Sequence, residues 1–259
     1  MRGWAGGVPS RQGQEGGMTV TDELRQAFAP TGVLRAALNH GNRVLVSRDE
    51  KGNAQGITVD LAHALAEELG LPLEFIHFEK AGDVTAAATQ GVYDVCFLAV
   101  DPARAETIFF TTPYVQIEGR YLASASCDTQ DAESLVAEGL KVAAVQGSAY
   151  TLELSRKPGA QNLVLFPDFA SAIEAFDTGK VPAIAGIGAV MEKEAASRPG
   201  SRVLKPPFMT IRQAMGMPRG RPLAEEYLAR FVLEMLKSRR VGEILERHGI
   251  SADCAPRVG

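Results

Sequence analysis

The sequence contains few of the residues that build metal or redox sites. Only three cysteines (Cys96, Cys127 and Cys254) and four histidines occur in 259 residues, and no HExxH or CxxC spacing is present. Because the cysteines are odd in number and far apart, neither a disulfide framework nor a zinc pattern is indicated. Cys96 lies in the apolar run 95–98, where we expect a buried, unreactive thiol. We predict no metal ion and no cofactor.

Long apolar runs and an excess of basic residues are also missing. No run approaches the roughly 20 apolar residues of a membrane span. The formal net charge is −4 and no long basic segment occurs, so we do not expect a nucleic-acid surface. Residues 1–17 are rich in glycine and polar residues and lack the apolar core of a signal peptide. We interpret residues 1–30 as a disordered N-terminal extension, with Met18 as an alternative start.

Motifs for covalent catalysis and nucleotide binding are absent. No GxSxG, no P-loop and no GxGxxG in a strand–helix context occurs. Ser148 has no partner histidine that the sequence can assign, and we therefore predict no catalytic residue. The composition that remains, 46% hydrophobic and 22% charged residues, is ordinary for a globular protein. A chain of 259 residues is long enough for two modest lobes.

Strand and helix patterns alternate along the chain. Leu61, Leu65 and Leu69 share one face of a helix predicted to end at Gly70, a residue suited to the position after a helix. The predicted strands are 33–38, 73–78, 94–100, 141–145, 163–166 and 183–187. The predicted helices are 58–70, 84–89, 149–154, one opened by a capping box at Ser171–Glu174, 223–236 and 241–248.

This order indicates an α/β protein with two open sheets. The near-continuous apolar run at 94–100 is typical of a parallel strand covered on both faces. We predict one lobe from residues 31–114 plus 214–259 and another from 119–208. The crossings, or hinges, are expected near 114–119 and 209–213.

The candidate site lies where strands end, because ligands of open α/β sheets bind outside the carboxyl ends of strands. Arg104 follows the strand 94–100 through an Asp101-Pro102 turn. Its guanidinium could clamp a carboxylate through two parallel hydrogen bonds. The alternative is a surface arginine paired with Glu106 or Asp101.

The second candidate is the segment Gln146-Gly147-Ser148-Ala149-Tyr150, which follows the strand 141–145. A glycine turn at a helix start presents free backbone N–H groups, and the Ser148 hydroxyl adds a donor. The alternative for Ser148 is an ordinary helix N-cap. Glu118, in the first hinge, could act as an acid or base, bind a cationic or hydroxyl group, or simply face water.

Several segments together resemble a known family. GITVDLA at 56–62, followed by EELG at 67–70, is similar to the "GFDVDLA…ELG" signature of bacterial extracellular solute-binding proteins of family 3. The later blocks, which complete the resemblance over residues 33–250, are YDV at 93–95 with Arg104 and FTTPY at 110–114, KVAAVQGS at 141–148, and AMGMP at 214–218.

The resemblance implies a two-lobe type II periplasmic-binding-protein fold with two hinge strands. It implies a substrate-binding protein that closes on a small carboxylate-bearing solute, an amino acid or related organic acid, for an ABC importer. Arg104 then binds the carboxylate, Ser148 adds a donor, and Asn39 and Asn42 supply polar groups after the first strand. A permease is the implied partner, and we expect a monomer. The family is periplasmic, whereas a chain complete as written and lacking a signal peptide would be cytoplasmic.

The sequence departs from the family pattern near the ligand. Ile187 occupies the position that usually supplies an acidic partner to the ligand's ammonium group. Residues 98–100, Leu-Ala-Val, replace the usual hydroxyl-bearing segment, and Asn42 replaces an aromatic residue. Since a buried ammonium without an acidic partner is costly, either Glu118 compensates or the ligand lacks an amine.

Two alternatives use the same fold. The first is an enzyme similar to the cyclohexadienyl dehydratases, which eliminate water from a cyclic carboxylate. It needs an acid inside the closed lobes, and Glu118 is the candidate. The second is a cytoplasmic solute sensor that works without a permease. The candidate ligand-binding residues are, in full, Asn39, Asn42, Arg104, Glu118, Gln146, Gly147, Ser148 and Tyr150.

Overall fold

A mixed sheet runs through the whole molecule. The structure is a computed structural model that describes residues 19–258. Within that range the strand order is β4-β1-β5-β11-β6-β9-β7-β8, with β10 added to β6. The strands of this sheet are β1 (Leu34–Asn39), β4 (Leu73–Phe78), β5 (Val95–Ala99), β6 (Ile108–Ala123), β7 (Val142–Val145), β8 (Leu163–Phe166), β9 (Ala183–Ile187), β10 (Arg202–Val203) and β11 (Met209–Pro218). A separate hairpin pairs β2 (Ser47–Arg48) with β3 (Ala54–Gln55).

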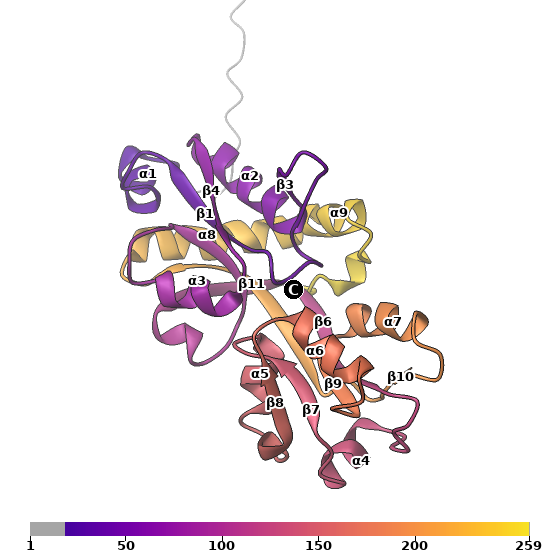
Figure 1. The fold of residues 1–259 in the computed structure, drawn as a ribbon. Coiled ribbons are helices and arrows are strands. Elements are labelled where there is room, and N and C mark those ends of the chain that lie inside the picture. The colour runs from indigo at the N-terminus through magenta and orange to yellow at the C-terminus, as the bar shows by residue number, and fades with distance from the viewer. Residues whose placement is uncertain (1–18, 259) are drawn as a thin grey trace, which may run out of the picture.

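Two long antiparallel strands join the halves of this sheet. β1 pairs in parallel with β4 and β5, and β7 pairs in parallel with β8 and β9. Between these groups, β11 pairs with β5 on one side and β6 pairs with β9 on the other. Figure 1 shows β6 and β11 passing from the upper half to the lower half. The predicted α/β fold with two lobes and two hinge crossings is confirmed.

The crossings themselves are strands rather than loops. The ladder between β11 and β6 runs from Met209 opposite Gly119 to Pro218 opposite Ile108. Its register shifts twice between Gln213 and Gly216, and each shift leaves one extra residue on the β6 side, which marks a β-bulge or irregularity in β6. We call the half with β1, β4 and β5 lobe 1 and the half with β7, β8 and β9 lobe 2. The residue boundaries predicted for the lobes remain a proposal.

The helices cover the two lobes separately (Figure 1). Lobe 1 carries α1 (Asp22–Phe28), α2 (Ile57–Leu69), α3 (Ala81–Ala87), α8 (Pro222–Lys237) and α9 (Arg240–Arg247). Lobe 2 carries α4 (Ala132–Ala137), α5 (Ala149–Leu154), α6 (Phe169–Asp177) and α7 (Gly188–Ala196). Three single 3-10 turns complete the elements of the described residues: η1 (Arg104–Glu106), η2 (Ala160–Asn162) and η3 (Ala252–Cys254). Within residues 19–258 no helix has the length and apolar character needed to span a bilayer.

Each lobe has its own hydrophobic core. The leucine stripe of α2 is buried, and Gly70 ends that helix with φ 65°, in the left-handed conformation that glycine adopts readily. The leucine stripe of α2 packs in one cluster with the buried stripe of α8, which consists of Leu228, Phe231, Val232, Met235 and Leu236. Tyr121, Leu135 and Leu154 belong to a different cluster in lobe 2. Because the cores are separate, each lobe is a packing unit of its own.

The N-terminal expectation is wrong for part of its range. Residues 22–28 form α1, whereas disorder was predicted for residues 1–30; residues 1–18 lie outside the described residues. Thr21 caps the helix, since its Oγ1 accepts a hydrogen bond from the Leu24 N–H at 3.2 Å. Leu24 and Phe28 are buried in the lobe 1 core, and the Phe28 ring meets Tyr227 edge to face. This packing orders the segment.

Two further local predictions have clear outcomes. The helix predicted to open at Ser171 starts earlier, because Asp168 is the N-cap and accepts hydrogen bonds from both the N–H and the hydroxyl of Ser171. The prediction that Cys96 is buried is confirmed, whereas its lack of reactivity stays a prediction. Its side chain is fully buried in β5, and burial raises the pKa of the thiol to about 12.

Candidate functional site

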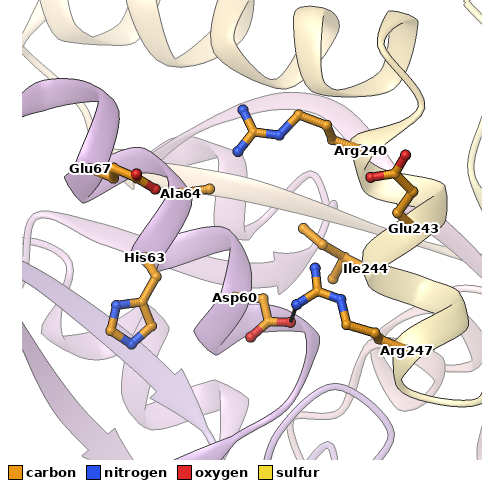
Figure 2. Close-up of a pocket in the computed structure, with 8 residues that line it drawn as sticks. All are labelled: Asp60, His63, Ala64, Glu67, Arg240, Glu243, Ile244 and Arg247. Atoms are coloured by element: carbon orange, nitrogen blue, oxygen red, sulfur yellow. Dashed lines mark ion pairs between the residues drawn. The ribbon is translucent and has the colours of Figure 1, made fainter.

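A surface groove in lobe 1 is not the predicted site. Figure 2 shows this groove of about 200 Å³ between α2 and α9, lined mostly by charged side chains. Within it, Asp60 pairs with Arg247 at 3.1 Å, and Asp60 also accepts a contact from His248 at 3.0 Å. Acidic and basic side chains are interspersed in the groove, so it favours neither an anionic nor a cationic ligand. None of its lining residues is a predicted ligand contact.

Arg104 lies where the two lobes meet. It begins η1, five positions after the last residue of β5, and only 2% of its surface is exposed. Its Nη1 donates to the carbonyl of Ala99 in lobe 1 at 3.0 Å, and its Nη2 donates to the carbonyl of Gly147 in lobe 2 at 2.9 Å. The two sequence candidates, separated by 43 positions, are therefore in direct contact.

The charge of Arg104 is poorly compensated. Burial lowers the pKa of its guanidinium, and the nearby Asp101 opposes that effect. Yet within residues 19–258 no carboxylate lies within ion-pairing distance of Arg104, so the alternative of a pair with Glu106 or Asp101 is not observed. The guanidinium is held by two neutral carbonyls. A buried cation in this state favours an anion beside it.

The segment Gln146–Tyr150 forms the lobe 2 side of this contact. Gly147 has φ 73°, a conformation that favours glycine, and its carbonyl reaches Arg104. Ser148 is the N-cap of α5: its Oγ accepts from the Thr151 N–H at 3.3 Å and donates to the Thr151 Oγ1 at 2.9 Å. Gln146 is exposed, and Tyr150 is buried in α5, where burial raises the pKa of its phenol to about 12.

The lobes touch at two further points near Arg104. Asp101 of lobe 1 accepts a hydrogen bond from the Arg156 guanidinium of lobe 2 at 2.7 Å. A Cβ placed on Gly147 would lie 3.8 Å from the Cα of Gly82, at the start of α3. We call this region, made by Gly82, Asp101, Arg104, Gly147 and Arg156, the interlobe seam. Sequence reasoning missed the role of Arg156, because no local pattern announces a partner 55 positions away.

The two asparagines lie in the loop after β1. Asn39 is the last residue of that strand, and its Oδ1 accepts from the Gly41 N–H at 3.1 Å. Asn42 is 8% exposed, and its buried Oδ1 has no hydrogen-bond partner among the described residues. A buried amide oxygen without a partner is a polar group available to a donor. Within residues 19–258 no hydrogen bond links either asparagine to Arg104.

Glu118 lies in β6, next to the residue that pairs with Ile187. Its carboxylate forms an ion pair with Arg120 at 2.7 Å, and half of its side chain is exposed. Gly119 is opposite Ile187, the last residue of β9. Glu118 is the acidic residue of β6 closest in register to Ile187, and its charge is therefore already paired with that of Arg120.

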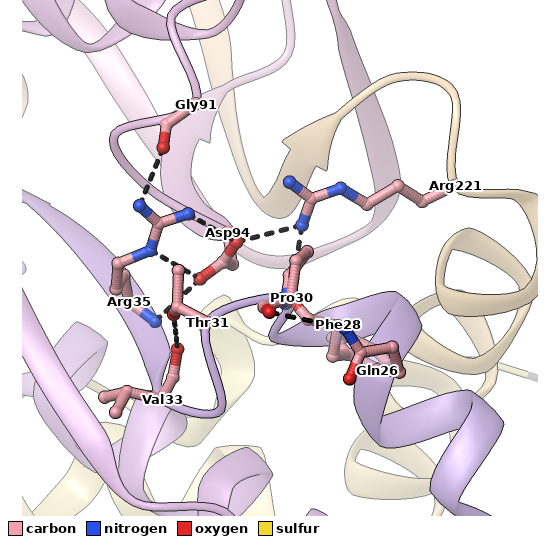
Figure 3. A network of polar contacts seen from close by, with 9 residues as sticks. All are labelled: Gln26, Phe28, Pro30, Thr31, Val33, Arg35, Gly91, Asp94 and Arg221. Atoms are coloured by element: carbon pink, nitrogen blue, oxygen red, sulfur yellow. Dashed lines mark hydrogen bonds and ion pairs between the residues drawn. The ribbon is translucent and has the colours of Figure 1, made fainter.

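Asp94, part of the second sequence block, has a structural role. It is fully buried and accepts two hydrogen bonds from the Arg35 guanidinium, both at 2.9 Å, and one from Arg221, also at 2.9 Å. Figure 3 shows the two arginines on either side of this carboxylate. Arg221 also donates to the Phe28 carbonyl at 3.1 Å, which ties α1 to the same network. All four residues belong to lobe 1.

Comparisons with known proteins agree with this architecture. The family model of bacterial extracellular solute-binding proteins, family 3, matches residues 34–250. A mutant of ArgBP from T. maritima has a similar structure, with a TM-score of 0.72 and 21% identity over 88% of this chain and 99% of that one. The ancestral amino acid-binding protein AncCDT-1, a precursor of cyclohexadienyl dehydratase, has a TM-score of 0.72 and 20% identity over 86% of this chain and 98% of that one.

Two curated proteins are similar in sequence. A probable histidine-binding protein of Neisseria gonorrhoeae is 24% identical over 206 residues, which are 77% of this chain and 76% of that protein. The amino-acid-binding protein AabA of Dichelobacter nodosus is 32% identical over 93 residues, or 35% of this chain, and the match spans 37% of that protein. The family model covers most of the chain, in the segments that build both lobes and both crossings. The chain belongs to the bacterial extracellular solute-binding proteins, family 3.

Proposed function

We propose that this protein binds a small carboxylate-bearing solute, an amino acid or a related organic acid, at the interlobe seam. The observation that carries the proposal is Arg104, a guanidinium that is 2% exposed and has no carboxylate partner within the described residues. Desolvating a cation without a counter-ion is unfavourable. A ligand carboxylate would supply the missing charge.

Arg104 retains N–H donors for such a contact. A guanidinium has five N–H donors, and the two carbonyl bonds of Arg104 use two of them. The remaining donors suit the parallel, two-bond recognition that a carboxylate allows. Because the carbonyls of Ala99 and Gly147 belong to different lobes, the guanidinium is positioned by both of them. Binding would therefore favour the form in which the lobes are together.

The acidic side chains near the seam limit the class of ligand. The named relatives are amino-acid-binding proteins, which supports an α-amino acid. Ile187 supplies no carboxylate, and Glu118 is already paired with Arg120. We therefore include carboxylates that lack an amine in the ligand class. Asn42, with its unpartnered buried Oδ1, is the proposed acceptor for a polar group on the ligand.

We propose that binding occurs without chemical turnover and that a membrane permease of an ABC importer receives the solute from a monomer. Glu118 is half exposed and ion-paired, whereas a catalytic acid works from an enclosed position. Incubation with prephenate and arogenate tests this directly. Formation of phenylpyruvate or phenylalanine would replace the binding assignment with a dehydratase.

The binding assignment is tested by a thermal-shift screen of amino acids and organic acids against three forms of the protein. We expect at least one carboxylate to raise the melting temperature of the parent. In Arg104→Lys the charge remains but the two-bond contact is lost, so affinity for that compound should fall at least about 100-fold. Arg240→Ala, which removes an arginine of the outer groove, is the control and should respond as the parent does.

A compound that stabilises Arg104→Lys as strongly as the parent would refute the role of Arg104. Circular dichroism of the two variants shows whether each is folded before affinities are compared.

A further inference from the structure

A second ionic contact at the seam involves residues that no sequence motif assigned to binding. Asp101 follows β5 and is 3% exposed. Its Oδ2 accepts a hydrogen bond at 2.7 Å from Arg156, which lies just after α5 in lobe 2. The Arg156 side chain is 44% exposed, so its charged end enters the seam from the rim. The contact joins two lobes whose cores are separate.

Asp101 also shapes the turn that presents Arg104. Its Oδ1 accepts a hydrogen bond from the Ala103 N–H at 2.9 Å, and its backbone carbonyl accepts one from the Ala105 N–H at 2.9 Å. These bonds lie within lobe 1 and need nothing from lobe 2. One oxygen of this carboxylate therefore stabilises the turn before Arg104, while the other binds Arg156 of the opposite lobe.

We propose that Asp101 and Arg156 form an interlobe latch, a pair that raises ligand affinity by stabilising the closed arrangement without touching the ligand. Arg156 can reach Asp101 only while the lobes are together. Its other partner, the carboxylate of Glu153 at 3.1 Å, lies in the same segment of lobe 2 and stays within reach in any arrangement. The latch therefore adds a differential interaction between open and closed forms, which is what shifts such an equilibrium.

Other charges near the seam act in the same direction but less directly. Lys80 of lobe 1 helps to lower the pKa of Asp168, the N-cap of α6 in lobe 2, after the larger effects of the Ser171 hydrogen bonds. Because that contact is longer-ranged and exposed, it is screened by salt. The Asp101–Arg156 pair is direct and has one buried partner, so it should dominate closure.

The test compares Asp101→Asn, Arg156→Gln and the double variant with the parent. Asp101→Asn keeps an amide oxygen for the Ala103 N–H, so the turn before Arg104 is preserved. Glu153→Gln is the matched control, because it removes the other partner of Arg156 within lobe 2. Each form is measured by small-angle X-ray scattering, alone and with L-arginine, L-histidine or L-glutamine, and by calorimetric titration of the same amino acids.

We expect each single latch variant to bind the effective amino acid about tenfold more weakly and to scatter as a more open particle. The double variant should be no worse than either single one, because both break the same pair. Glu153→Gln should behave as the parent. Additive losses in the double variant, or parent-like affinity and scattering in both single variants, would overturn the latch.

The latch rests on the proposed function for its effect on affinity, but its failure can be distinguished from that of the function. If none of the three amino acids binds the parent, the thermal-shift screen of amino acids and organic acids decides the proposed function, and the scattering of the ligand-free proteins decides the latch. If Asp101→Asn does not fold, the test depends on Arg156→Gln, because this variant changes only a half-exposed side chain.

Discussion

The two ends of β5 hold two buried aspartates with different partners. Asp94 precedes the strand and is fully buried; Asp101 follows it and is 3% exposed. Both carboxylates bind arginine. The partners of Asp94, Arg35 and Arg221, lie in lobe 1, whereas the partner of Asp101 lies in lobe 2. The same chemistry thus stabilises one lobe at one end of the strand and joins two lobes at the other.

The largest effect is expected from Asp94→Asn. This change leaves two arginines without their shared carboxylate in a buried site, and the free energy of unfolding should fall by about 3–5 kcal/mol. Urea denaturation measures it. Asp22→Asn, at a carboxylate whose side chain is 99% exposed, is the control and should leave the denaturation midpoint unchanged. Equal midpoints for the two variants would contradict the structural role of Asp94.

The comparison is sharpened by two arginine variants of the same type. Arg221→Gln removes a lobe 1 partner of Asp94 and the bond to the Phe28 carbonyl, so it should lower stability by roughly 1–3 kcal/mol. Arg156→Gln removes the lobe 2 partner of Asp101 and should lower stability by less than about 1 kcal/mol. Urea denaturation of both variants checks the order. A reversed order would mean that the pair at the seam contributes to folding rather than to closure.

The smallest effect concerns a polar pair confined to the edge of lobe 1. His40 Nε2 and His77 Nδ1 lie 2.9 Å apart with their rings stacked, so one of these nitrogens donates a hydrogen bond to the other. Burial, followed by the charge of Arg48, lowers the pKa of both imidazoles, and Glu79 opposes this. As the pH falls, the unfolded chain then takes up protons before the folded one.

Stability should therefore be retained above the ordinary histidine pKa of 6.5 and lost progressively below it. His77→Gln should flatten this dependence, while His63→Gln, at an exposed histidine of α2, should not. Melting temperatures between about pH 7.5 and 5 measure the slope. Because the pair lies within lobe 1, ligand affinity at a fixed pH near 7.5 should not change. A flat profile in the parent would refute the prediction.

Local periodicity accounts for the elements that the sequence predicted well. The strand at 73–78 and the strand at 183–187 have the bounds of β4 and β9. The leucine spacing of α2 and the stripe of α8 depend on neighbours within a few positions, so the pattern is readable. That Arg104 and the segment 146–150 would lie at facing strand ends was predicted from strand order, because the carboxyl ends of parallel strands define the ligand edge of a sheet, but their direct hydrogen bond was not.

Long-range contacts explain what the sequence did not show. β6 extends from Ile108 to Ala123, but its partners are strands from three other parts of the chain, and only a short hinge was predicted there. α1 is a short helix ordered by the core of lobe 1, so the polar sequence before it misled the prediction. The Asp101–Arg156 pair depends on the relative position of two lobes, which no local spacing encodes.

The register shift between β6 and β11 has a mechanical consequence. Hydrogen-bonded strands resist shear along their length, and a bulge is the place where such a ribbon bends most easily. The irregularity opposite Gln213–Gly216 lies where β11 is paired with β5 on one side and with β6 on the other. Bending at this bulge would move the lobes about a hydrogen-bonded pair of strands rather than about a flexible loop.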